Sequence, residues 1–259
     1  MDFIKTNRKK DYAIVQLSRG KVNAINHQMV EEIRATFREL EADDSVRGVI
    51  LTGIPRYFSA GLDVIELYGY DKEKMDAFFI SFGSMHIEMA QFSKPLIGAI
   101  TGHSPAGGCV MAICCDHRIM ADGEEFTIGL NEVEVNIQIS QNIINAYSFW
   151  LGTGPAHKHI LSGKLLKVKE ALRAGLVDES CPVEEVLPTA EKRMKALLQA
   201  NQNILVNTKA KLRHSWLSQI NDQAGEDLKM AREAWWSPDV RARMGMFVEY
   251  LKNRSKAKV

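Results

Sequence analysis

Apolar and amphipathic segments alternate along the first half of the chain. Short apolar runs rich in strand-forming residues predict buried strands. These runs are 12–18 (YAIVQLS), 48–53 (GVILTG), 95–102 (PLIGAITG) and, as two shorter strands, 117–129. Between them, apolar residues recur at helical spacing with charged residues in the gaps, which predicts helices over 27–42 and 72–91. Strands that alternate with helices in this way are typical of an α/β fold.

The pattern changes after residue 140, where the strand signals fade. Most of 189–236 is rich in helix-forming residues, and a last helix is predicted to begin at Pro238 with Ser237 as its N-cap. The apolar stripe of that helix is Val240, Met244, Phe247 and Leu251. We therefore predict an α/β core over 1–190 and a helical C-terminal region over 191–259.

Two of the predicted strands are followed by turns of small residues, SAG (59–61) and HSPAGG (103–108). Turns of this kind present unpaired backbone N–H groups where a helix begins. If the N–H groups of Leu62 and Gly107 pointed at one spot, they would form a two-donor site for an anionic oxygen. The simpler interpretation is a pair of tight strand-to-helix turns. The run CVMAICC (109–115) predicts a buried helix and favours the donor site, but both interpretations stay open.

Acidic residues offer a candidate base. Glu132 and Glu134 lie among apolar residues in IGLNEVEV (128–135). A glutamate near apolar walls has a raised pKa and can act as a base, whereas a solvated carboxylate in a loop does not. The residues themselves do not choose between these two. Asp63 lies where a helix is predicted to start, so helix capping is its expected role.

Composition limits the class of protein. The chain has 259 residues, 46% of them apolar and 25% charged, with a formal net charge of +1. This balance gives no overall attraction to nucleic acid or to an acidic membrane. The longest wholly apolar run, 109–115, is far shorter than the roughly 20 residues of a membrane span. The four cysteines form no CxxC pair, the histidines have no metal-ligand spacing, and the N-terminus is polar, so we predict a cytoplasmic protein without a metal site.

At this point several segments together resemble one known family. They are RYFSAGLD (56–63), SKPLIGAITGHSPAGGC (93–109), CDHRIMAD (115–122), FTIGLNE (126–132), AHKHILSG (156–163) and KEALRAGLVDE (169–179). The chain resembles the enoyl-CoA hydratase/isomerase family, the crotonases. The resemblance implies a crotonase-like spiral of ββα units with a C-terminal helical region. It also implies an acyl-CoA thioester as the substrate, no separate cofactor because coenzyme A belongs to that substrate, and assembly into trimers or dimers of trimers.

The resemblance also assigns residues to roles. The family's two oxyanion donors fall on the backbone N–H groups of Leu62 and Gly107, and its catalytic glutamate falls on Glu132. Val110 stands where hydratases of the family have a second glutamate. The remaining positions implied for substrate binding are Ala24 in the loop 21–26 (KVNAIN), Ala60, Gly61, Asp63, Gly108, Val110 and Lys252, the last for phosphates of coenzyme A.

These assignments favour a Δ3,Δ2-enoyl-CoA isomerase that moves a double bond with one glutamate. Two alternatives stay within the family: hydration or thioester hydrolysis with a single glutamate, and a catalytically disabled acyl-CoA-binding relative. The second alternative rests on Asn136 and Ser140, which replace the glycine and proline that family members commonly have there. A nucleotide-phosphate site at the glycine turns is disfavoured, because neither GxGxxG nor a P-loop lysine is present.

Overall fold

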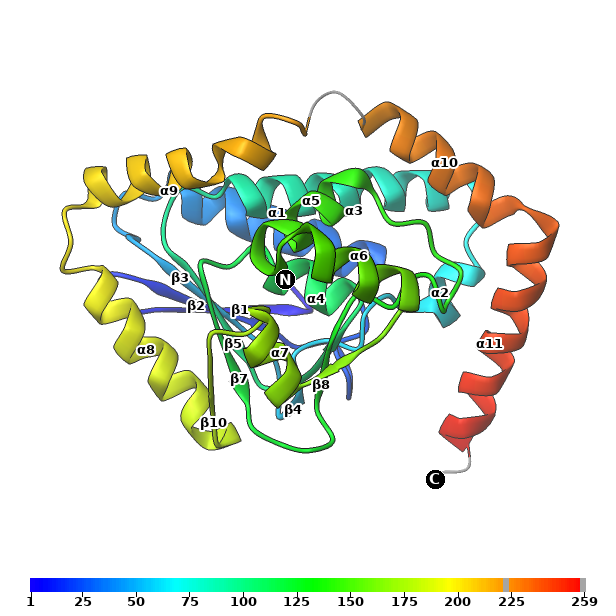
Figure 1. Ribbon diagram of the computed structural model, residues 1–259, viewed down its shortest axis with the longest axis horizontal. Helices are drawn as coiled ribbons and strands as arrows, with labels where there is room; N and C mark the ends of the chain where they lie inside the picture. The colour runs from blue at the N-terminus through cyan, green and yellow to red at the C-terminus, as the bar shows by residue number, and fades with distance from the viewer. Residues whose placement is uncertain (221–223, 257–259) are drawn as a thin grey trace.

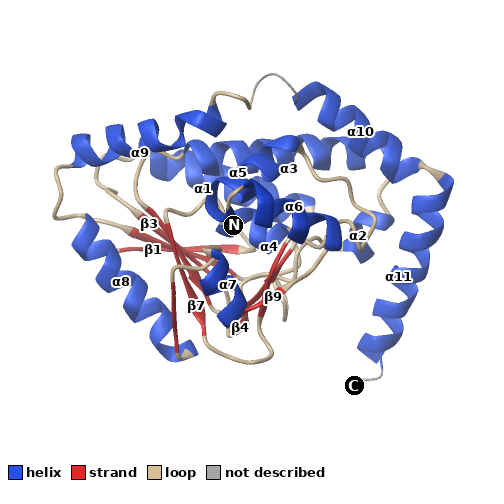
Figure 2. Ribbon diagram, viewed as in Figure 1, coloured by secondary structure: helices blue, strands red, loops and turns tan. Residues whose placement is uncertain are grey.

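Two β-sheets organise the chain in this computed structural model, which describes residues 1–220 and 224–256. The first sheet has six strands in the order β1-β2-β3-β5-β7-β10, and the second has four in the order β4-β6-β8-β9. The first sheet consists of β1 (Ile4–Arg8), β2 (Ala13–Leu17), β3 (Val49–Thr52), β5 (Leu96–Ile100), β7 (His117–Ala121) and β10 (Glu179–Cys181). The second consists of β4 (Arg56–Tyr57), β6 (Gly102–Pro105), β8 (Thr127–Gly129) and β9 (Leu166–Lys167). Figure 2 shows the strands together, with helices around them.

The central strands of the first sheet are parallel and buried. Every residue of β3 (VILT) and of β5 (LIGAI) is buried, as expected for parallel strands covered on both faces. Strand β1 pairs antiparallel with β2 at the edge of the sheet, and only Ile4 among its residues is buried. The apolar runs predicted as strands therefore form the centre of this sheet.

Helices surround the sheets. They are α1 (His27–Ala42), α2 (Val64–Tyr68), α3 (Lys72–Gln91), α4 (Gly107–Ala112), α5 (Gln141–Leu151), α6 (Thr153–Ser162), α7 (Val168–Ala174), the 3-10 helix η1 (Val183–Glu185), α8 (Val186–Leu197), α9 (Gln202–Leu217), α10 (Ala224–Trp236) and α11 (Pro238–Lys256). The predicted helices over 27–42 and 72–91 are confirmed as α1 and α3. Helix α8 packs against β3, β5 and β7, whereas α1 packs against α3.

A strand–strand–helix unit repeats along the core, which confirms the predicted α/β spiral. The units β3–β4–α2, β5–β6–α4 and β7–β8–α5 each add one strand to each sheet. The structure corrects one detail, because residues 95–102 do not form one strand. They divide between β5 and β6, and His103 lies within β6 instead of a turn. Gly102 permits this arrangement, since a Cβ atom there would lie 2.1 Å from the carbonyl oxygen of Arg56 on β4.

The C-terminal region consists of helices, as predicted. The predicted boundary at residue 190 lies inside α8, and residues 221–223 of the predicted helical stretch are outside the described residues. Figure 1 shows α9 and α10 along the top of the view and α11 along its right side. The Ser237 hydroxyl accepts a hydrogen bond from the Val240 N–H at 3.4 Å, as an N-cap residue does. Met244 is buried, and Phe247 and Leu251 of the predicted stripe pack against the core.

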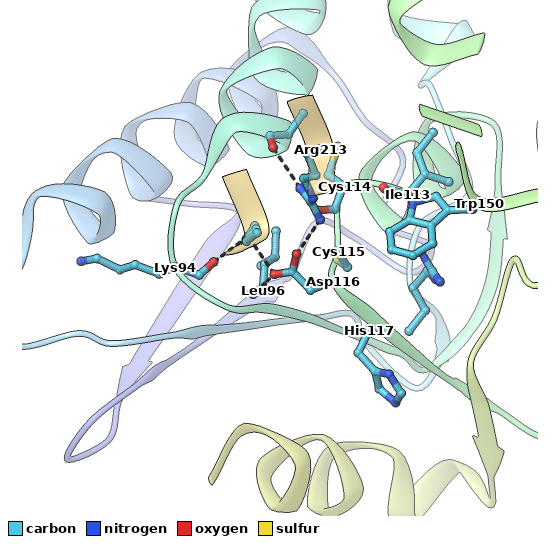
Figure 3. Close-up of polar contacts among 12 residues, drawn as sticks. Lys94, Leu96, Ile113, Cys114, Cys115, Asp116, His117, Trp150 and Arg213 are labelled. Carbon is cyan, nitrogen blue, oxygen red and sulfur yellow. Dashed lines mark hydrogen bonds and ion pairs between the residues drawn. The ribbon is translucent and has the colours of Figure 1, made fainter. Parts of the chain in front are cut away.

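A buried ionic cluster attaches α9 to the core. Asp116, which follows α4, pairs with Arg213 and Lys209 of α9 at 2.7 Å each. Arg213 also donates hydrogen bonds to the carbonyl oxygens of Ala90 and Cys114 at 2.9 and 2.8 Å. Figure 3 shows the Arg213 guanidinium directed at Asp116. Arg213 thus pairs with carbonyls near the C-terminal ends of α3 and α4, where the helix itself supplies no donor.

Within the described part of the chain, no helix combines the length and the apolar character needed to cross a bilayer.

Replacing Arg213 tests how far the fold depends on this cluster. Arg213→Met should lower the free energy of unfolding by about 3–5 kcal/mol, because Asp116 and two carbonyls lose a buried partner. Denaturant unfolding monitored by circular dichroism measures the change. The control is Arg193→Met, which removes a partly exposed pair with Glu179 at 2.8 Å and should cost at most about 1 kcal/mol. Equal losses in both variants would contradict the assigned importance of the cluster.

Candidate active site

Three residues predicted to be catalytic follow three neighbouring strands of the second sheet. Strands β4, β6 and β8 are adjacent and parallel, so their C-terminal ends meet at one edge. Leu62 comes after β4, Gly107 directly follows Ala106 after β6, and Glu132 comes after β8. All three line one cavity with a volume of about 230 Å³. The fold therefore brings together residues separated by up to 70 positions in the sequence.

Leu62 presents an unpaired N–H group. Residues Ile25 and Leu62 form a parallel bridge, in which the Ile25 N–H donates to the Gly61 carbonyl and the Asp63 N–H donates to the Ile25 carbonyl, both at 2.8 Å. Successive N–H groups of an extended chain point to opposite sides. The Leu62 N–H is therefore directed away from Ile25, and it has no hydrogen-bond partner among the described residues. Because α2 begins only at Val64, this donor belongs to an extended segment and not to the first turn of the helix.

Gly107 presents the second N–H group that has no hydrogen-bond partner in the described part of the chain. It is the first residue of α4, and such a position has no acceptor within its own helix. The preceding Ala106 has φ +46° and ψ −118°, a conformation that is strained for any residue with a side chain. A hydrogen bond from the Ala106 N–H to the Gly129 carbonyl, 2.8 Å long, links this turn to the end of β8. Helix α4 has only six residues, all buried, as predicted for the run after Gly108.

The two turns are in direct contact. A Cβ atom at Gly61 would lie 3.2 Å from the Cβ of Ala106 and 3.6 Å from the N atom of Gly107. Gly61 also has φ +83°, which favours glycine. A residue with a side chain at position 61 would therefore push the second turn away from the first. The small residues noted in the sequence allow the two N–H groups to lie near each other.

Glu132 is the buried acid of the site. Its side chain is only 6% exposed, and Oε2 has no hydrogen-bond partner among the described residues. Burial raises the pKa of Glu132 to about 7, and a hydrogen bond from its own backbone opposes this only in part. Glu134, by contrast, is exposed, and its side chain lies beside Gly163 instead of in the cavity. Of the two glutamates that the sequence left as candidates, the structure directs Glu132 into the cavity.

The loop after Glu132 explains the two departures from the family pattern. Asn136 has φ +59°, and the Ile137 N–H donates to the Glu132 carbonyl at 2.9 Å while the Asn136 N–H donates to the Val133 carbonyl at 3.4 Å. This pair of bonds is a Schellman motif, in which asparagine can replace glycine in the left-handed position. Ser140 is the N-cap residue of α5 and has φ −75°, an angle that proline also adopts. Both residues are therefore compatible with a loop that holds Glu132.

The other predicted binding residues lie around the first turn. The Ala24 carbonyl accepts from Arg19 Nη1 at 2.6 Å, and the Ala60 N–H donates to the Val22 carbonyl at 2.9 Å. These contacts attach the loop 21–26 to the turn. Asp63 caps α2 through the Glu66 N–H at 3.1 Å, as predicted, and pairs with Arg19 at 2.8 Å. Its proposed contact with substrate stays a prediction.

Gly108, Val110 and Lys252 do not line the cavity. A Cβ atom at Gly108 would lie 3.0 Å from the Ser104 hydroxyl and 3.1 Å from the Ser59 carbonyl, so glycine there allows the second turn to pack. Val110 is 1% exposed within α4. Lys252 is exposed on α11, 3.5 Å from Glu249. The roles of these three residues in binding also stay predictions.

The sequence did not identify the walls of the cavity. Helix α3 contributes several apolar residues, and α10 contributes Leu228 and Ala231. The α3 residues include Phe78, Phe79, Phe82 and Ile87. The aromatic run FFISF (78–82) was a visible signal, but helical spacing alone does not separate a face against the core from one against a cavity. Within the residues that the structure describes, no group of three or more His, Cys, Asp or Glu could hold a metal ion.

Comparison with known proteins identifies the class to which this fold and site belong. The family model described as enoyl-CoA hydratase/isomerase matches residues 7–257. The chain therefore belongs to the enoyl-CoA hydratase/isomerase family, a family of enzymes with the crotonase fold.

Individual relatives give more detail. The mouse protein named enoyl-CoA delta isomerase 1, mitochondrial, is 31% identical over 252 residues, which cover 97% of this chain and 87% of the relative. A probable enoyl-CoA hydratase of Mycobacterium leprae is 27% identical over 249 residues, with 96% and 95% covered. The crystal structure of human mitochondrial Δ3-Δ2-enoyl-CoA isomerase superposes with a TM-score of 0.93 at 28% identity, with 97% and 99% covered.

The raised pKa of Glu132 predicts how stability changes with pH. The pKa of Glu132 is 4.5 in the unfolded chain and about 7 in the folded protein. The folded state therefore binds the proton more tightly, and the free energy of unfolding decreases as pH rises from about 4.5 to 7. The decrease amounts to about 3 kcal/mol. The Glu132→Gln variant lacks this ionisation. It should match the original protein in free energy of unfolding at pH 4 and exceed it at pH 8. Denaturant unfolding at both pH values checks this, and a difference that does not change with pH would refute it.

Proposed function

We propose that the protein is an enoyl-CoA isomerase that converts a 3-enoyl-CoA thioester to the 2-enoyl-CoA. One observation carries the proposal: a single buried carboxyl group, that of Glu132, lines the same cavity as two backbone segments with unpaired N–H groups. The similarity to proteins named as isomerases supports it. No metal or separate cofactor is required, because each step moves only a proton and electron pairs.

The reaction follows from the chemistry of these groups. The Glu132 carboxylate removes a proton from C2, and the electron pair of that C–H bond forms a dienolate. The negative charge rests on the thioester oxygen, where the N–H groups of Leu62 and Gly107 act as an oxyanion hole. The protonated carboxyl then delivers the same proton to C4, and the double bond lies between C2 and C3. The proton count balances without water.

The two catalytic contributions are of reasonable size. A correctly placed general base contributes roughly 10²–10⁴-fold. An oxyanion donor contributes about 3–4 kcal/mol when the charge on the oxygen develops in the transition state. The direct contact between the two turns supports a preorganised donor pair, because Gly61 packs against Ala106 and Gly107 with no room for a larger side chain between them. The low exposure of Glu132 also suits proton abstraction from carbon, which needs a base with a raised pKa.

Val110 favours isomerisation over hydration. Water addition in this family is expected to use a second carboxylate at this position, and the isopropyl group of Val110 can neither hold nor deprotonate water. Val110 is also 1% exposed within the wholly buried α4. The alternatives of hydration, thioester hydrolysis or binding without turnover each predict a different assay result.

The cavity supports a medium or long acyl group as the substrate. Its wall is mostly apolar and comes from α3, the loop after Glu132 and α10. We further propose that coenzyme A follows the loop 21–26, that Lys252 approaches its phosphates, and that the protein assembles as a homotrimer or a dimer of trimers. A cytoplasmic location remains part of the proposal, although the mouse relative is named as mitochondrial.

Removing the base tests the proposal directly. Glu132→Gln keeps the size of the side chain but cannot accept a proton from carbon, so kcat/KM for a medium-chain 3-enoyl-CoA should fall by at least about 10²-fold. Formation of the conjugated 2-enoyl-CoA is followed by its ultraviolet absorbance.

Glu134→Gln is the matched control, because it makes the same change on an exposed residue two positions away, and it should retain the original rate. Undiminished isomerisation in Glu132→Gln would contradict the proposal. So would faster hydration of crotonyl-CoA than isomerisation in the original protein, or tight binding of CoA esters without any turnover.

The pH dependence provides a second test. Only ionised Glu132 can act as the base, and its pKa is raised to about 7. The value of kcat/KM should therefore increase as pH rises through about 7 and level off above it. Initial rates across pH 5.5 to 9 measure the profile. A rate already at its plateau at pH 5.5 would mean that the base has an ordinary pKa and that the buried state of Glu132 is not the active one.

A further inference from the structure

Two polar side chains in the cavity wall have atoms without a partner. His86 of α3 is 1% exposed and Asn142 of α5 is 5% exposed, and both line the cavity that also holds Glu132. Neither His86 Nε2 nor Asn142 Oδ1 has a hydrogen-bond partner among the described residues. Buried polar atoms are nearly always paired, because a donor or acceptor without a partner loses its hydrogen bonds to water and gains none in the protein. A substrate whose acyl group is an unsubstituted hydrocarbon would leave both atoms unpaired.

The proposed reaction does not account for these two residues. Glu132 performs the proton transfer, and Asp227 accepts a hydrogen bond from the Gln141 N–H at 2.8 Å, so each of these cavity acids has a role. His86 is held in place by packing, with its ring centroid 6.4 Å from that of Trp216. Burial lowers the pKa of His86 to about 4, so its imidazole is neutral at physiological pH. A neutral imidazole offers one N–H donor and one acceptor nitrogen.

We propose that the acyl group of the natural substrate carries a hydroxyl group, and that His86 and Asn142 bind it within the cavity. This inference rests on the proposed function, because it names the acyl group of the same CoA ester. A hydroxyl group both donates and accepts hydrogen bonds. It donates its single O–H to Asn142 Oδ1 and accepts a hydrogen bond from the Nε2–H of the neutral His86 imidazole. A keto group only accepts, so it cannot pair with Asn142 Oδ1, which is why the hydroxyl is the better match.

The hydroxyl belongs to the part of the chain beyond the reacting carbons. The thioester oxygen, C2 and C4 are assigned to Leu62, Gly107 and Glu132, which follow strands of the second sheet. His86 and Asn142 instead come from helices α3 and α5, whose neighbouring residues Phe82, Ile87 and Ile143 form the apolar wall. The cavity thus combines an apolar wall with a localised polar contact, an arrangement that typically gives a site its specificity.

Binding of saturated acyl-CoA esters tests this inference without requiring turnover. Calorimetric titration compares medium-chain esters of equal length with a hydroxyl group at the terminal carbon, at the penultimate carbon, at a mid-chain carbon, or absent. At least one hydroxylated ester should bind about tenfold more tightly than the unsubstituted one. The matching keto ester should not share this advantage.

Substitutions identify the groups responsible. Asn142→Leu and His86→Phe should each reduce the preference for the hydroxylated ester to about threefold or less, while the unsubstituted ester binds as well as before or better. Retained binding of the unsubstituted ester also shows that these variants fold. The control is Asn145→Leu, the same change on α5 at a residue that contacts Gln141 and Gln219 instead of the cavity, and it should keep the full preference.

Two results would overturn the inference. One is equal affinity for all esters in the original protein, which means that water alone occupies the polar contact. The other is a preference that survives both Asn142→Leu and His86→Phe. Failure of isomerisation with a retained hydroxyl preference would refute only the proposed reaction. Normal isomerisation without a hydroxyl preference would refute only this inference.

Discussion

The parallel pairing of β4, β6 and β8 is the constraint on which the site depends. These strands have only two, four and three residues, so short pairings are enough to align the three chain segments. Parallel pairing directs all three chain segments to the same edge, where the first two leave as turns with unpaired N–H groups and the third leads to Glu132. A strand in the opposite direction would send its segment to the other edge. The grouping of the candidate catalytic residues is therefore a consequence of strand direction as much as of side-chain identity.

Contact between the two small-residue turns adds precision to this arrangement. Gly61 lies against Ala106 and Gly107, and the Ala106 N–H is tied to the end of β8. The candidate donors are main-chain groups, one partly buried at Leu62 and one buried at Gly107, so their positions depend on the backbone instead of on the rotamer of any side chain. The strained backbone at Ala106 is maintained by these surroundings. Preorganisation of this kind is what gives an oxyanion hole its effect, since no reorientation is needed during the reaction.

The helical C-terminal region takes part in the site and not only in covering the core. Asp227 of α10 lines the cavity and accepts from the first N–H of α5, and Arg232 of the same helix forms an ion pair with Asp76 of α3 at 3.0 Å. Helix α9 is held by the Asp116 cluster. Together these contacts hold α10 at the cavity, whose lining it shares with Glu132. Burial is the cause of the raised pKa of Glu132, and α10 contributes Leu228 and Ala231 to the wall of the cavity that Glu132 lines.

Much of the fold followed from local pattern in the sequence. Apolar runs and helical spacing correctly predicted β3, β5, α1 and α3, because burial of a strand or of a helix face requires particular residues at regular intervals. Motif resemblance supplied the family and the positions of Leu62, Gly107 and Glu132. The split between β5 and β6 escaped the pattern, since Gly102 and His103 show no strand periodicity and their pairing depends on Arg56, far away in the chain.

What only the tertiary structure decided concerns distance and burial. The residues by themselves left the acid undecided and the family resemblance selected Glu132; in the folded chain the turn closed by Asn136 buries Glu132 and exposes Glu134. The pattern of residues along the chain did not indicate that α3 and α10 enclose a cavity, or that His86 and Asn142 share its wall. A local pattern reports which residues prefer to be buried. Which buried groups face each other depends on contacts between distant segments, and these exist only in the folded chain.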